Sequence, residues 1–237
     1  MADTETLDDL VRRVDPDRWL TTRFIADPAA RADVTALYGL NYELARVAGG
    51  VSNALMGEIR ITWWREAMEE VAAAKAPRKH PNVEALAASG FDPNALAALA
   101  DARFTDLDEG PLNDEAAVMA YVDGTAGALA VLAARRLDPG ADPHAVKGAA
   151  RAWGLAGLWR LKQAGRSRLP ESWTQADVKQ RVEAQLKAAR DEIKRLPVAA
   201  FPAVAPAALA RSYVSGRELS ELEKKARLTF SVATGRL

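Results

Sequence analysis

Apolar residues recur at helical spacing through residues 36–70. They follow steps of three and four residues in two sets, Leu37, Leu40, Leu44 and Val47, then Val51, Leu55, Ile59 and Trp63. Such steps place each set on one face of a helix. The pattern predicts two core helices, at about 28–48 and 52–74, that meet near the Gly49–Gly50 pair. The wide rings of Trp63 and Trp64 favour a core position for the second helix.

Shorter apolar patterns, separated by proline and glycine breaks, predict further helices along the chain. Their ranges are about 7–14, 83–88, 93–106, 114–136, 143–163, 174–196, 203–214 and 218–227. Asp27, Asp114 and Asp142 stand where N-cap residues are expected. Because no repeat and no long linker interrupts the series, we predict one all-α domain over 1–237, a helical bundle with its core at about 18–206.

Composition excludes several classes of protein. The 237 residues are 49% hydrophobic, which is enough for a core, and 32 basic residues balance 32 acidic ones. A net charge of zero gives no global positive field, so no nucleic-acid partner is expected. The absence of cysteine excludes disulfides and thiolate metal sites. His80 and His144 both stand beside prolines and are interpreted as loop residues.

The termini bear on location. The acidic start MADTETLDDL resembles neither a secretory nor a mitochondrial presequence. No run of 18 residues lacks both charge and proline, so no membrane span is expected. These features predict a cytoplasmic, bacterial protein. The Ala-Pro tail with Phe201 and Tyr213 is expected to pack back on the bundle. Its alternative is peripheral contact with the inner membrane.

Three segments resemble one known family. The squalene/phytoene synthases have segments similar to Ala36-Leu37-Tyr38 with Ile59-x-x-x-Trp63-Trp64-Arg65, to Tyr121-x-x-x-Thr125-Ala126-Gly127, and to Leu169-Pro170. These are all-helical enzymes that join two prenyl diphosphates head to head. The resemblance covers about residues 18–206. It implies the isoprenoid (terpenoid) synthase type of bundle.

By the same resemblance, the family's metal-ligand positions are occupied here by residues that have no side-chain oxygen. Active members carry Asp-x-x-x-Asp motifs that bind magnesium and diphosphate. Ala45 and Gly49 stand at the first pair of positions, and Leu161 and Gly165 at the second. Neither alanine, leucine nor glycine offers a side-chain oxygen to magnesium. The resemblance therefore implies no catalytic residue, no metal site and no cofactor in this chain.

The nearest carboxylate pair is Glu66 and Glu70, which lies almost six turns past the family position. Flanked by Arg65 and Glu69, it indicates a solvated helix face. The resemblance gives candidate residues for a ligand cavity: Tyr38, Asn41, Trp64, Tyr121, Gly127 and Arg160. Arg166 and Arg168 are candidates for an anion site, with ordinary loop solvation as the alternative.

Three hypotheses about function follow from the resemblance. The first is a catalytically inactive protein that binds a protein partner or a lipid. The sequence resembles the branch of the family that includes a mitochondrial complex I assembly factor. This resemblance implies a role in respiratory complex assembly. The second is a prenyltransferase with a relocated magnesium site. The third is an isoprenoid or lipid carrier that uses the old prenyl cavity without chemistry.

Overall fold

Every regular element in the described part of the chain is helical. The computed structural model describes residues 5–51, 53–166 and 168–237, and the all-α prediction is confirmed there. Ser52, the predicted start of the second core helix, lies outside the described residues. Contacts within the chain divide it into two compact units, Met1–Asp108 and Glu109–Leu237. The single domain over 1–237 therefore stays a prediction.

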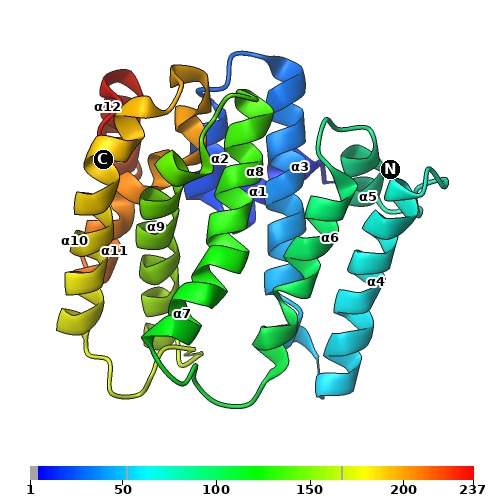
Figure 1. Ribbon diagram of the computed structural model, residues 1–237, viewed down its shortest axis with the longest axis horizontal. Helices are drawn as coiled ribbons and strands as arrows, with labels where there is room; N and C mark the ends of the chain where they lie inside the picture. The colour runs from blue at the N-terminus through cyan, green and yellow to red at the C-terminus, as the bar shows by residue number, and fades with distance from the viewer. Residues whose placement is uncertain (1–4, 52, 167) are drawn as a thin grey trace. The chain divides into compact units, whose positions relative to one another are not determined.

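The first unit holds the two predicted core helices and four shorter ones (Figure 1). They are α1 (Leu7–Val14), α2 (Pro16–Thr22), α3 (Pro28–Ala45), α4 (Ala54–Ala72), α5 (Pro81–Ala87) and α6 (Pro93–Asp101), with 3₁₀ turns at Ala48–Gly50 and Phe104–Leu107. The Asp27 carboxylate accepts from the backbone N–H groups of Ala29 and Ala30, as an N-cap does. Helices α1, α2 and α5 pack on α3, while α4 packs on α6.

The buried face of α4 differs from the predicted one. Leu55 is 64% exposed and Ile59 is 53% exposed, so the predicted core stripe faces outward along that part of the helix. The buried residues lie on a neighbouring face and are Gly57, Ile61, Trp64, Ala67 and Met68. Both faces carry apolar side chains at helical spacing, so periodicity alone did not choose between them. Contact with α6 and the turn at Phe104–Leu107 selected the second face.

The second unit begins with a long helix that contains one irregular turn. Its elements are α7 (Glu115–Val122), a π-helical turn (Asp123–Gly127), α8 (Ala128–Leu137), α9 (Pro143–Gln163), α10 (Gln175–Glu192), α11 (Ala210–Val214) and α12 (Glu221–Thr234), with 3₁₀ turns at Ile193–Arg195, Val198–Ala203 and Ala205–Leu209. Asp114 and Asp142 cap α7 and α9 as predicted. Helix α12 runs longer than the predicted 218–227 and ends at Gly235, which has a left-handed backbone.

Helix α9 is the centre of the second unit, and α10 packs along it (Figure 1). The prediction that the Ala-Pro tail packs back is confirmed within this unit, because Phe201 is 2% exposed and Leu209 is fully buried. The turn at Val198–Ala203 contacts α8, and the turn at Ala205–Leu209 contacts α9 and α12. A tail rich in small residues allows these close contacts.

One described stretch, Glu115–Leu137, is long and apolar enough to cross a membrane. The sequence analysis predicted no membrane span, because charged residues such as Asp123 interrupt this stretch. A core helix meets the same criterion of length and composition. Val118, Val122, Leu129 and Ala133 of this stretch are buried among the other helices. Because 39% of its apolar window is buried, Glu115–Leu137 contributes one face to the core of the second unit.

Candidate functional site

The first pair of residues that the resemblance assigns to the family's metal positions lies at the end of α3. Ala45 is the last residue of that helix, and Gly49 lies in the 3₁₀ turn that follows. Both are exposed, and neither carries a side-chain oxygen. Magnesium prefers carboxylate and other oxygen ligands in octahedral geometry, so this turn does not fit the ion.

Tyr38, the first cavity candidate, lies in the core of the first unit. It is 2% exposed, and the Arg18 guanidinium stands 5.7 Å from the centre of its ring. Burial raises the pKa of the Tyr38 phenol to about 12, because the phenolate would lose its hydration. Tyr38 is thus held as a neutral phenol over the whole physiological range of pH.

Asn41, one turn further along α3, belongs to a polar cluster that the sequence analysis did not identify. Its side-chain oxygen accepts a hydrogen bond of 2.8 Å from Arg103, which also pairs with Asp106 at 3.2 Å. The side chains of Arg103 and Asp106 are each 11% exposed, so this ion pair is largely removed from water. The spacing of Arg103 and Asp106 was visible in the sequence, but the hydrogen bond from Arg103 to Asn41 depends on the fold.

Trp64, the third candidate in the first unit, is 5% exposed. Its indole makes edge-to-face contacts with Trp63, at 5.0 Å between ring centres, and with His80, at 4.9 Å. His80 was predicted to be an ordinary loop residue. It instead caps α5, since its Nδ1 accepts from the N–H of Asn82 at 3.2 Å.

In the second unit, the candidate Tyr121 lies in α7 just before the π-helical turn, and the candidate Gly127 is the last residue of that turn. The Thr125 hydroxyl donates to the Tyr121 carbonyl at 2.7 Å. Asp123, the first residue of the turn, receives two hydrogen bonds of 2.6 Å from Arg151 on α9. This pairing raises the pKa of the Arg151 guanidinium. Single π turns are frequent at functional sites, and neither the turn nor the ion pair was foreseen from the sequence.

The second pair of residues that the resemblance assigns to the family's metal positions lies at the end of α9. Leu161 is partly buried, whereas Gly165 is exposed with a left-handed φ of +73°. Between them, the Lys162 ammonium donates to the carbonyls of Pro170, Glu171 and Trp173 at 2.7–3.3 Å. This end of α9 therefore anchors the following loop and supplies no carboxylate.

The remaining candidates are all basic. The guanidinium of Arg160 stacks on the ring of Tyr213, 4.5 Å from its centre. Arg168 donates to the Gly110 carbonyl and so joins two loops of the second unit. Arg166 is exposed at the end of the turn after α9. The role of Arg166 and Arg168 in anion binding stays a prediction.

Carboxylates elsewhere in the described residues do not gather into a replacement site. Within these residues, no three side chains of the types His, Cys, Asp or Glu come close enough to hold a metal ion. Glu66 and Glu70 both pair with Arg78, at 3.0 and 2.8 Å. The single charge of Arg78 offsets one of the two negative charges, and the predicted solvated face carries an ion-pair cluster in which Glu66 is 49% exposed.

Comparison with known proteins identifies the class. The squalene/phytoene synthase family matches residues 11–182, which is most of the chain. The chain is a member of the squalene/phytoene synthase family. No curated protein sequence matches it significantly.

Two solved structures share the fold over nearly the whole chain. A dehydrosqualene synthase in complex with ligand aligns with a TM-score of 0.75 and 12% identity, covering 96% of this chain and 94% of that one. The squalene synthase HpnC from Alicyclobacillus acidocaldarius aligns with a TM-score of 0.67 and 13% identity, covering 97% of this chain and 92% of that one. The expected isoprenoid-synthase type of bundle is thereby confirmed.

Proposed function

We propose that this protein is a catalytically inactive member of its family that acts by binding a protein partner or an isoprenoid-like lipid. The observation that carries the proposal is the chemistry of four positions. By the resemblance, the positions of the family's aspartates are occupied by Ala45, Gly49, Leu161 and Gly165, whereas the helical frame is retained. Assembly of a respiratory membrane complex, implied by the similar branch, is the setting we propose for this binding.

Loss of these carboxylates would abolish catalysis because the reaction requires diphosphate to leave the substrate. Ionisation of a prenyl diphosphate leaves a highly charged group, which metal ions stabilise as Lewis acids. The ions themselves need carboxylate ligands on facing helices. The helix ends at Ala45 and Leu161 supply methyl and isobutyl groups instead. A protein with these residues keeps surfaces for binding and lacks the ligands for turnover.

The decisive experiment is calorimetry with a non-hydrolysable farnesyl diphosphate analogue and magnesium, with and without chelator. We expect that chelator does not change the binding of the analogue, and that farnesyl diphosphate itself is not turned over. Chelator-sensitive binding, or turnover, would overturn the proposal and favour an active prenyltransferase. Binding with the same affinity in the presence of chelator would favour a lipid ligand. The absence of any binding would favour a protein partner.

A pair of designed variants sharpens this test. The double variant Ala45→Asp with Gly49→Asp places two carboxylates at the end of α3, and the double variant Ala48→Asp with Gly50→Asp places two in the same exposed turn as a matched control. If Ala45 and Gly49 are equivalent to the family's ligands, the first double variant gains affinity for magnesium in calorimetry and the control does not. Equal behaviour of the two variants would show that the positions were assigned wrongly.

A further inference from the structure

A surface groove in the first unit lies beside the end of α3 and does not include any of the family's metal positions. Its volume is about 310 Å³, within the range of roughly 300–1,000 Å³ that is usual for small-molecule sites. It is lined by Glu43, Arg46, Val47, Arg60, Trp63, Trp64 and His80. Glu43 and Ala45 are two positions apart on one helix, so their side chains leave it in opposing directions. The groove is therefore on the other side of α3 from the exposed Ala45.

The groove has an aromatic wall. Trp63, Trp64 and His80 contact one another edge to face, with ring centres 4.9–5.8 Å apart. Trp63 is further held by Arg78, whose guanidinium stands 5.2 Å from its ring and donates to its carbonyl oxygen. Rings fixed in this way form a rigid apolar surface for a flat ligand, and Val47 adds a buried aliphatic group.

The polar groups at the groove favour a negative charge. The Arg46 guanidinium is already paired with Glu43 at 2.8 Å. Arg60 is exposed and donates from Nη1 to the Gly50 carbonyl at 3.1 Å, which fixes its position. No carboxylate in the described part of the chain forms an ion pair with it. A guanidinium presents five donors in a planar fork that suits carboxylate and phosphate.

His80 adds a second donor. Because its Nδ1 accepts from the N–H of Asn82, the proton of the neutral ring lies on Nε2. An imidazole Nε2–H is a donor for an anion, and it belongs to a residue that lines the groove. An aromatic wall, one arginine and one histidine thus line a single small volume.

We propose that this groove binds a compact aromatic anion, with its flat body against Trp63 and its carboxylate or phosphate at Arg60. The proposal does not rest on the proposed function, because no residue of the groove is a family metal position. It assigns a second ligand site to the first unit, with a ligand class set by stacking and charge.

The test uses the full chain and 2-naphthoate as the probe, followed by the indole N–H signals of the six tryptophans in NMR spectra. Trp63→Phe and Trp64→Phe assign two of these signals. We expect 2-naphthoate to shift the signals of Trp63 and Trp64 and to leave those of the other four tryptophans in place. Absence of binding at millimolar probe, or shifts confined to other tryptophans, would overturn the proposal.

Charge is tested separately, with variants on the protein surface that should not disturb folding. Arg60→Gln should weaken 2-naphthoate binding at least tenfold, because a charge-assisted hydrogen bond is lost. Arg135→Gln, at an exposed arginine of α8, should leave the affinity unchanged. The neutral probe 2-naphthalenemethanol should bind at least tenfold more weakly than 2-naphthoate. Equal affinity of Arg60→Gln and the native chain, or of the two probes, would contradict the proposal.

Discussion

Arg151 holds both carboxylate oxygens of Asp123, with its Nε and Nη2 atoms each 2.6 Å from an oxygen. The pair joins the middle of α9 to the first residue of the π-helical turn. The two side chains are 23% and 34% exposed, so water screens the pair only in part. A two-point contact of this kind fixes geometry as well as charge.

Arg151→Lys keeps the positive charge and removes the planar fork. We expect it to lower the free energy of unfolding by about 1–2 kcal/mol, because at least one charge-assisted hydrogen bond is lost. Urea denaturation of the full chain measures this. Lys147→Met is the matched control, since Lys147 approaches the same carboxylate at 3.6 Å from one turn away. If Lys147→Met costs as much, the bidentate geometry is not the source of the stability.

Close helix packing gives a second prediction, on Gly154 of α9. A Cβ atom there would stand 2.6 Å from Cγ1 of Val122 and 3.1 Å from Cβ of Ala126, atoms of α7 and the π-helical turn. Overpacking of this kind is expected to cost about 1–3 kcal/mol in Gly154→Ala. The melting temperature should fall accordingly.

Gly157, three residues further along the same helix, provides the control. Nothing lies within 4 Å of a Cβ built on it. Gly157→Ala should be neutral or stabilise the protein by up to about 1 kcal/mol, because alanine has the higher helix propensity. A drop in melting temperature of the same size in both variants would refute packing as the reason for Gly154.

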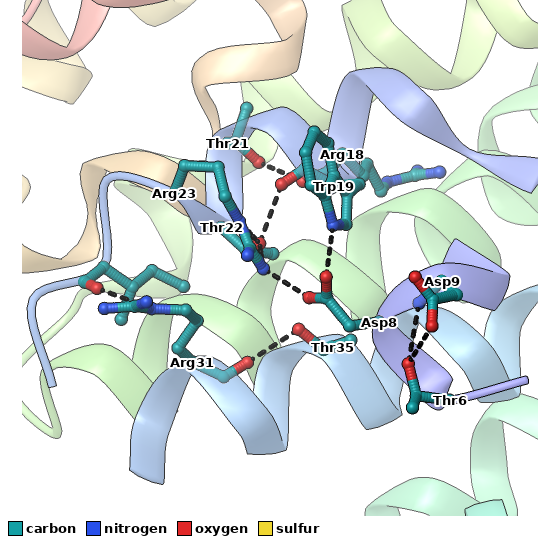
Figure 2. Close-up of polar contacts among 11 residues, drawn as sticks. Thr6, Asp8, Asp9, Arg18, Trp19, Thr21, Thr22, Arg23, Arg31 and Thr35 are labelled. Atoms are coloured by element: carbon teal, nitrogen blue, oxygen red, sulfur yellow. Dashed lines mark hydrogen bonds and ion pairs between the residues drawn. The ribbon is translucent and has the colours of Figure 1, made fainter. Parts of the chain in front are cut away.

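The third prediction concerns the carboxylate that ties α1 to α2 (Figure 2). Asp8 accepts from the indole N–H of Trp19 at 2.9 Å and from Arg23 at 2.5 Å. Arg23 also stacks on the Trp19 ring, 4.7 Å from its centre. Asp8→Ala leaves both donors without this acceptor, and we expect a loss of about 1 kcal/mol in the free energy of unfolding.

Hydrogen exchange distinguishes a local from a global effect of that change. We expect the amides of α1 to exchange faster in Asp8→Ala, because α1 loses its polar contact with α2. Asp9→Ala is the control: its carboxylate bonds only with Thr6 in the described contacts, at the start of the same helix. The idea fails if the two variants speed up exchange in α1 equally.

The buried phenol of Tyr38 predicts the alkaline limit of stability. Burial raises its pKa from 10.0 to about 12. Above pH 10 the unfolded chain releases this proton while the folded chain retains it, so the free energy of unfolding falls as the pH rises from 10 to about 12. The contribution is fully present below pH 10.

Urea denaturation of the native chain and of Tyr38→Phe at a series of alkaline pH values measures the contribution of the Tyr38 phenol to the free energy of unfolding. Phenylalanine cannot ionise, so the variant should lose stability less steeply over this range than the native chain. Tyr42→Phe, one turn along α3 at a partly exposed position, is the matched control. Parallel curves for Tyr38→Phe and the native chain would exclude Tyr38 as the group responsible.

Much of the local structure could be predicted because local chemistry sets it. Helix α1 begins and ends as predicted, and α3 and α9 begin at the predicted Asp-Pro steps. A capping carboxylate and a proline act within three or four residues, so the sequence contains the whole interaction. The family, too, was visible in short segments such as Trp63-Trp64-Arg65.

Contacts between distant residues were decided by the tertiary structure. The sequence did not indicate that Asn41 would meet Arg103, that Asp123 would meet Arg151, or that Leu55 would be exposed while Ile61 is buried. Each depends on which helices pack together and at what rotation, and a helix with two apolar faces does not specify that alone. The sequence by itself determined most of the helices and the family, whereas only packing determined the aromatic groove and the buried polar pairs.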